Sequence, residues 1–204
     1  MSDSPTSERL AAPGTHLSRD ERLRALLEAA SDLIAERGIS EVSLSAIATR
    51  SGVSRQWLYE FFPDIDSIFA ALYQNARDEY LKPNATPPVG LFERIEYLKR
   101  EIDSYLDLPV ACAIVGSYAI NGGLRKTGSI RALRESILGN LERGWVEPMV
   151  QQGVSREESY ASVITLMNTV YGLVTAIDGG LTTRAVAQRR LAPVIDAVVI
   201  HGLA

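Results

Sequence analysis

The sequence predicts an all-α protein of about nine helices, with a small helical domain at the N-terminus and a larger one after it. Apolar residues recur every three or four positions in successive stretches, as along one face of a helix. The pattern Ser-x-x-Glu, typical of a capped helix start, occurs at residues 18–21 and again at 155–158. We find no alternation of apolar and polar residues long enough to build a sheet.

Composition narrows the class of protein. The 204 residues are 46% hydrophobic and 23% charged, which is typical of a folded globular chain. A net charge of −4 argues against coating nucleic acid or membrane through bulk charge. The single cysteine, Cys112, and two scattered histidines predict neither an intrachain disulfide nor a metal site, and no motif calls for a cofactor. Residues 1–17 have no basic start or apolar stretch, so we expect a disordered tail, no signal peptide and a cytoplasmic chain.

Capping residues divide the segment 18–64 into three short helices. The first follows Ser18 and ends at Gly38, and the second follows Ser43. Gly52 ends the second helix, and Ser54 opens a third that runs through Phe62. We assign residues 18–64 to one domain and residues 65–204 to a second, which begins with a helix capped by Asp64.

Helical spacing continues through the second domain. After a proline-rich loop at 82–90, an amphipathic helix extends up to Pro109, with one apolar stripe formed by Phe92, Ile95, Leu98, Ile102, Tyr105 and Leu106. The stretch 108–124 contains no charge, so its helix should lie inside the domain. Another amphipathic helix covers 129–151 and should be distorted near Pro148.

A second uncharged stretch, residues 159–177, needs a separate explanation. A membrane span is disfavoured because serine, threonine and asparagine recur along it and no basic flank sets an orientation. A helix covered on all sides in so small a protein should pack against its own domain and against a second copy. We therefore expect a homodimer that also uses the last helix, which Pro193 should kink. The predicted interface consists of Val163, Leu166, Val170, Leu173, Val174, Ile177, Leu191, Val194, Ile195 and Val198.

The second and third helices have the pattern of a helix-turn-helix. This motif needs a small residue where the helices cross, a glycine in the turn, and apolar residues behind the second helix. Ala48, Gly52 and Leu58 stand at these places, with Val53 and Phe61 as further apolar contacts. If Leu58 points inward, the opposite side of its helix faces solvent, with Arg55 in the first turn.

These residues resemble the tetracycline-repressor (TetR) family of bacterial transcription regulators. The resemblance rests on Ala30 and Gly38, then on Ile47-Ala48, Gly52-Val53-Ser54, Leu58-Tyr59, Phe62 and Pro63-Asp64. It implies that the third helix enters the major groove of double-stranded operator DNA and that the C-terminal helices dimerise and bind a small-molecule inducer. By position, it implies base contacts from Arg55, Gln56 and Trp57 and phosphate contacts from Ser43, Ser45 and Tyr59. Trp57 also fits a packing role, and Ile65 replaces the family's frequent lysine.

The second domain also contains a scatter of amphipathic side chains between its helices. They predict a pocket for a largely apolar or aromatic ligand, lined by Tyr97, Tyr105, Tyr118, Trp145, Met149, Met167, Asn168 and Tyr171, although ordinary core packing explains the same residues. We find no catalytic motif, so an enzyme is disfavoured. The alternative function is a helical protein-binding adaptor with a vestigial helix-turn-helix.

Overall fold

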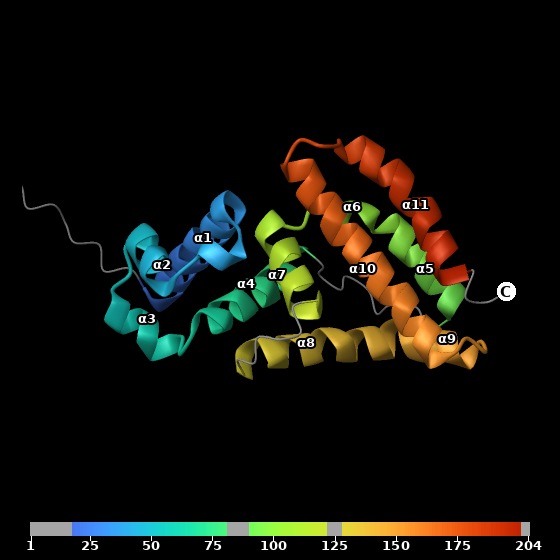
Figure 1. The fold of residues 1–204 in the computed structure, drawn as a ribbon, viewed down its shortest axis with the longest axis horizontal. Coiled ribbons are helices and arrows are strands. Elements are labelled where there is room, and N and C mark those ends of the chain that lie inside the picture. Colours follow the sequence, from blue (N-terminus) through green and yellow to red (C-terminus); the bar gives the residue numbers. More distant parts are fainter. Residues whose placement is uncertain (1–17, 81–89, 122–127, 201–204) are drawn as a thin grey trace, which may run out of the picture.

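The computed structural model describes residues 18–80, 90–121 and 128–200, with side chains described up to residue 197. Every regular element in these ranges is helical, which confirms the all-α prediction. The predicted tail at 1–17 and nearly all of the predicted loop at 82–90 fall outside the described residues, as does the side chain of Val198. The helices over residues 19–61 form one end of the molecule, and those over residues 91–106 and 147–200 form the other (Figure 1).

Capping produces the N-terminal helices where the sequence predicts them. Helix α1 (Arg19–Arg37) begins at a complete capping box between Ser18 and Glu21 and ends at Gly38, whose φ is 77°. A short 3₁₀ turn (Ile39–Glu41) leads to α2 (Leu44–Ser51), which is followed by α3 (Arg55–Phe61). Three helices of this length bury a core around Leu26, Ile47 and Leu58.

Helix α4 (Ile65–Tyr80) connects this domain to the rest of the molecule. The Asp64 carboxylate accepts the backbone N–H of Ser67 at 2.7 Å, so Asp64 caps the helix as the sequence indicates. Along its length α4 contacts α1, α7 and α8. In Figure 1 it runs from the end of α3 towards α7.

The predicted helix over 92–109 is divided in two. Helix α5 (Leu91–Arg100) and helix α6 (Ile102–Leu106) meet at Glu101. Phe92 was expected in the apolar stripe, but its side chain is 58% exposed, whereas that of Leu91 is 4% exposed. Residues 91, 95, 98 and 102 follow the helical repeat more closely than a stripe that starts at 92. The buried stripe therefore begins at Leu91, and Phe92 faces solvent. Helix α7 (Val110–Asn121) is largely buried, as predicted.

Pro148 distorts the next predicted helix. It divides into α8 (Gly128–Leu141), a π-helical turn (Glu142–Val146) and α9 (Glu147–Gln151). Since proline has no N–H, the carbonyl four residues earlier, on Gly144, lacks its helical donor. Arg94 supplies a substitute, because its Nη1 donates a hydrogen bond to the Gly144 oxygen at 2.8 Å.

The uncharged stretch forms most of α10 (Arg156–Asp178), which packs between α7 and α11 (Arg184–Ile200). Its cap differs in detail from a full capping box, because the Glu158 carboxylate accepts the Ser155 hydroxyl rather than the Ser155 N–H. Helix α10 is long and apolar enough to cross a membrane. The core helices of soluble proteins often meet the same criteria of length and composition. Within the chain α10 is buried on one face only, and its other face remains accessible.

Candidate nucleic-acid interface

The turn and the crossing point of the α2–turn–α3 unit are each specified by particular residues. Gly52 has φ 69° and ψ 7°, the left-handed conformation that glycine adopts without a steric penalty. The Ser54 hydroxyl accepts the N–H of Trp57 at 3.2 Å and so begins α3. Ala48 and Leu58 are buried where the two helices meet. Each of these features agrees with the sequence prediction.

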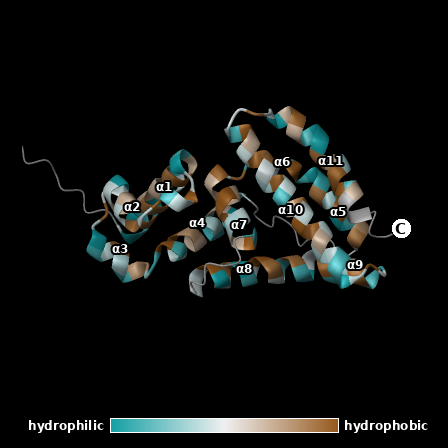
Figure 2. Cartoon of the chain, in the orientation of Figure 1, coloured by the Kyte–Doolittle hydropathy of each residue, from teal (hydrophilic) through white to brown (hydrophobic). Residues whose placement is uncertain are grey.

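Helix α3 presents a polar outer face opposite Leu58. Arg55, Gln56 and Glu60 are exposed, and Tyr59 is 57% exposed although it is a large apolar side chain. The start of α3 is accordingly hydrophilic in Figure 2. An exposed arginine and glutamine in the first turn of a helix can make the paired hydrogen bonds that read guanine and adenine in a major groove.

Trp57 lies on the flank of α3 rather than at its outermost edge. Its side chain is half-buried and its ring packs against Phe61, with centroids 4.6 Å apart. The Arg19 guanidinium covers the Phe61 ring at 4.7 Å, so this stack joins the start of α1 to α3. Of the two roles that the sequence left open for Trp57, the packing role accounts for these contacts.

The two serines at the start of α2 have different surroundings. Ser43 is exposed and its hydroxyl oxygen accepts the N–H of Ala46 at 3.2 Å, which leaves its own O–H proton available to a phosphate. Ser45 is half-buried, and its backbone carbonyl accepts the Thr49 hydroxyl. Ser43 is the N-cap of α2, and Ser45 lies in its first turn.

A bidentate ion pair between Arg50 and Glu36 connects α2 to α1. Arg50 donates to both carboxylate oxygens of Glu36, at 2.7 and 2.8 Å. These hydrogen bonds lower the pKa of the Glu36 carboxyl below its ordinary value. The pair is partly exposed, so its main effect is to fix geometry rather than to add much stability. This ion pair could not be predicted from the sequence, because the two residues are 14 positions apart and no local pattern relates them.

The eight residues predicted for a ligand pocket have different surroundings within the part of the chain that the structure describes. Met149 and Tyr171 are buried in the core, and Asn168 accepts a hydrogen bond from Asn121 at 2.7 Å. Tyr118 lines a small cavity of about 320 Å³ beside α4. The remaining residues are half-buried among the helices of the second domain: Tyr97, Tyr105, Trp145 and Met167. A larger cavity of about 540 Å³ lies between α1 and α4, and none of the eight lines it.

The predicted dimer residues also require correction. The chain's own helices already cover six of them, each less than 9% exposed: Val163, Leu166, Val170, Val174, Leu191 and Ile195. Leu173, Ile177 and Val194 are half-buried against the same core. The accessible face of α10 instead carries small uncharged residues, namely Ala161, Thr165, Asn168, Gly172 and Ala176, which we call the α10 strip. Apolar residues were chosen from the sequence, but the protomer needs them for its own core.

Comparison with known proteins finds similarity to transcriptional regulators of the helix-turn-helix type. Residues 26–72 match the family described as bacterial regulatory proteins, tetR family. The HTH-type transcriptional activator FasR of Mycolicibacterium smegmatis is 38% identical over 65 residues, which cover 32% of this chain and 30% of that protein. The HTH-type transcriptional regulator HbdR of Aromatoleum sp. is 28% identical over 121 residues, covering 58% of this chain and 50% of that protein.

The likeness of the fold extends further along the chain. A tetR-family transcriptional regulator from Streptomyces coelicolor has a TM-score of 0.59 at 23% identity, covering 91% of this chain and 83% of that one. A TetR family regulator from Marinobacter aquaeolei has a TM-score of 0.60 at 22% identity, covering 87% and 95%. Over residues 26–72 the chain is therefore similar to the tetR family of bacterial regulatory proteins. The curated relatives match it over half of their own length or less.

Proposed function

We propose that the chain is a transcriptional repressor that binds a palindromic operator as a dimer. A small apolar or aromatic ligand then releases it from the operator. The observation that carries this proposal is the exposed polar face of α3, with Arg55 and Gln56 in its first turn. Two copies related by a twofold axis would present their α3 helices to successive major grooves, about 34–36 Å apart. The adaptor alternative gives these exposed side chains no role.

The α10 strip supports dimerisation. It is accessible and uncharged, and its small side chains allow two helices to approach closely. Helix α4 supports the coupling of ligand to DNA, because it contacts both α1 and the C-terminal helices α7 and α8. A ligand that binds better to one orientation of α4 would shift the spacing of the two α3 helices and weaken operator binding.

The dimer proposal predicts the effect of Gly172→Glu. A Cβ at Gly172 meets no atom within 4 Å, so the protomer accommodates a side chain there. The new carboxylates would face each other across a twofold interface, where burial of unpaired charge is costly. We expect a folded monomer by light scattering, with helical content unchanged. Gln152→Glu, which adds the same charge at the exposed residue that follows α9, should leave the dimer intact. A dimeric Gly172→Glu protein would refute the α10 strip as the interface.

A mobility-shift titration against the chain's own upstream DNA tests the function itself. Residues 19–62 carry six arginines and seven acidic residues, so few phosphates can be neutralised in each dimer. We therefore expect a sequence-dependent shift whose log–log salt slope is shallow, at about −0.9 per phosphate contact. A slope near about −10 would contradict the contact set, since it requires many more phosphates. No shift at low salt would favour the adaptor.

The direction of regulation is a separate question. One relative, from Mycolicibacterium, is named an activator, whereas the proposal here is repression. A reporter placed behind the bound operator distinguishes them. Loss of the regulator should raise reporter expression, and a fall would favour activation.

A further inference from the structure

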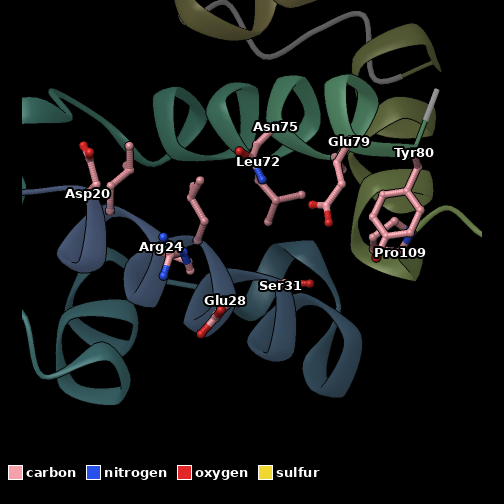
Figure 3. Close-up of a pocket in the computed structure, with 12 residues that line it drawn as sticks. Asp20, Arg24, Glu28, Ser31, Leu72, Asn75, Glu79, Tyr80 and Pro109 are labelled. Atoms are coloured by element: carbon pink, nitrogen blue, oxygen red, sulfur yellow. The ribbon is translucent and has the colours of Figure 1, made fainter. Parts of the chain in front are cut away.

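The largest of the cavities described above is a groove between the DNA-binding domain and α4. It has a volume of about 540 Å³, within the usual range for small-molecule sites. Its lining comes from α1, from α4 and from Pro109 just before α7: Asp20, Leu23, Arg24, Leu27, Glu28, Ser31, Leu72, Asn75, Ala76, Glu79, Tyr80 and Pro109. In Figure 3 Leu72 and Glu79 point from α4 towards α1, while Tyr80 and Pro109 mark one end.

The groove has an apolar floor and a polar rim. Leu27, Leu72 and Ala76 are buried beneath it, and the Tyr80 ring is partly exposed at its end. The rim consists of exposed side chains from both helices. A ligand seated here would therefore cover apolar surface with one part and remain in contact with polar groups and water with another.

The charges on the rim favour a cation. Asp20, Glu28 and Glu79 contribute three carboxylates, against the single guanidinium of Arg24. Within the part of the chain that the structure describes, these three carboxylates have no ion pair or side-chain hydrogen bond. A positive group in the groove would be attracted by this excess of negative charge, and the Tyr80 ring could add a cation–π contact.

We propose that this groove binds an amphiphilic organic cation and thereby acts as a second effector site. The cationic end lies near the Glu79 carboxylate and the Tyr80 ring, and the apolar body covers Leu27 and Leu72 (Figure 3). The carboxylates of Asp20 and Glu28 add negative charge further along the rim. Because the occupied groove bridges α1 and α4, the ligand favours one orientation of the DNA-binding domain relative to α4. Binding itself does not depend on the proposed function, but its effect on operator affinity does.

Calorimetry with three probes of one skeleton tests the site. We expect 4-phenylbutylammonium to bind the full chain at least about fivefold more tightly than uncharged 4-phenylbutanol, since exposed charge pairs each add a modest attraction. Anionic 4-phenylbutyrate should bind more weakly than the alcohol. The preference for the cation should shrink as salt is added, because its charge contacts are near the surface. Equal affinity for the three probes would overturn the proposal.

Substitutions in and outside the groove test where the cation binds. The triple variant Asp20→Asn, Glu28→Gln and Glu79→Gln should abolish the preference for the cation while binding of the alcohol is unchanged. The control removes the same charge from exposed residues outside the groove, through Asp32→Asn, Glu41→Gln and Asp78→Asn, and should keep the preference. Asn75→Trp, which fills the groove from its rim, should weaken binding of the ammonium probe and of the alcohol alike. A preference that survives in the triple variant would place the cation elsewhere and refute the site.

Operator affinity tests whether a ligand in the groove regulates DNA binding. At a concentration that saturates the wild-type groove but not that of the triple variant, 4-phenylbutylammonium should shift operator affinity of the wild-type chain measurably and that of the triple variant clearly less. An unchanged wild-type affinity, with calorimetric binding intact, would overturn the regulatory role alone. A chain that never binds its operator would refute the proposed function, and calorimetry would still decide whether the groove binds cations.

Discussion

Replacing Arg55 and Gln56 together by alanine should lower operator affinity at least about a hundredfold, because each bidentate base contact is worth about 1–3 kcal/mol and a dimer makes each contact twice. Both side chains are exposed in the first turn of α3, so neither contributes to the folded core. We therefore expect unchanged helical content and melting temperature. Fluorescence anisotropy with labelled operator gives the affinity.

A matched control removes the same residue types elsewhere. Arg134→Ala with Gln151→Ala changes exposed residues on α8 and α9 and alters the net charge equally. This control should keep operator affinity within a few-fold of the wild type. If the two double variants lose affinity equally, bulk charge rather than base recognition carries binding. If neither loses affinity, α3 is not the recognition helix.

The N-terminal domain could be predicted in detail because its determinants are local. Ser18, Ser43 and Ser54 cap three helices within a few residues of sequence, and Gly38 and Gly52 end two of them. Such signals act over one helical turn and do not depend on distant packing. The exposed face of α3 then follows from the burial of Leu58 and the helical repeat.

The dimer and ligand residues were harder to predict, because periodicity identifies an apolar face without identifying what covers it. Val163 and Leu191 were expected at an interface between copies, but α10 and α11 bury them against each other and the rest of the core. The residues of the accessible α10 strip are small and uncharged, so they do not form the stripe of large apolar side chains that periodicity detects. Likewise the α1–α4 groove joins residues more than 40 positions apart, a distance that no local pattern spans.

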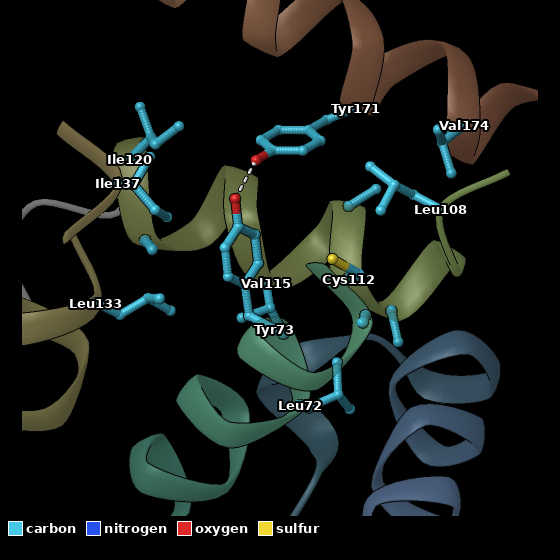
Figure 4. Close-up of a cluster of buried hydrophobic side chains, with 14 of the residues drawn as sticks. Leu72, Tyr73, Leu108, Cys112, Val115, Ile120, Leu133, Ile137, Tyr171 and Val174 are labelled. Carbon is cyan, nitrogen blue, oxygen red and sulfur yellow. Dashed lines mark hydrogen bonds between the residues drawn. The ribbon is translucent and has the colours of Figure 1, made fainter. Parts of the chain in front are cut away.

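Two buried tyrosines, Tyr73 on α4 and Tyr171 on α10, connect these helices through their hydroxyl groups. Tyr73 and Tyr171 are 5% and 3% exposed, and their hydroxyl oxygens share a hydrogen bond of 2.9 Å (Figure 4). Gly116 on α7 makes room for this arrangement, since a Cβ there would lie 2.6 Å from the Tyr171 ring. Burial raises the pKa of Tyr73 to about 12 and also raises the pKa of Tyr171 well above its ordinary value, so both hydroxyls are protonated at neutral pH.

Tyr73→Phe should lower the free energy of unfolding by about 1–3 kcal/mol, because it leaves the Tyr171 hydroxyl buried without this partner. Tyr171→Phe should cost about as much for the same reason. The double variant removes both hydroxyls, so no polar group is left unpaired, and its loss should be clearly smaller than the sum of the two single losses. Urea unfolding of the four proteins measures this coupling. Strictly additive losses would mean that the two hydroxyls do not depend on each other.

The pH dependence gives an independent check on the same pair. An unfolded tyrosine loses its proton near pH 10, whereas folded Tyr73 holds its proton up to about pH 12. Between these values the unfolded chain binds fewer protons than the native chain, so stability falls as pH rises. The double phenylalanine variant should lose less stability than the wild type between pH 10 and 12. Equal slopes would show that the pair titrates as if exposed, and α4 would then not be fastened to α10 by a buried hydrogen bond.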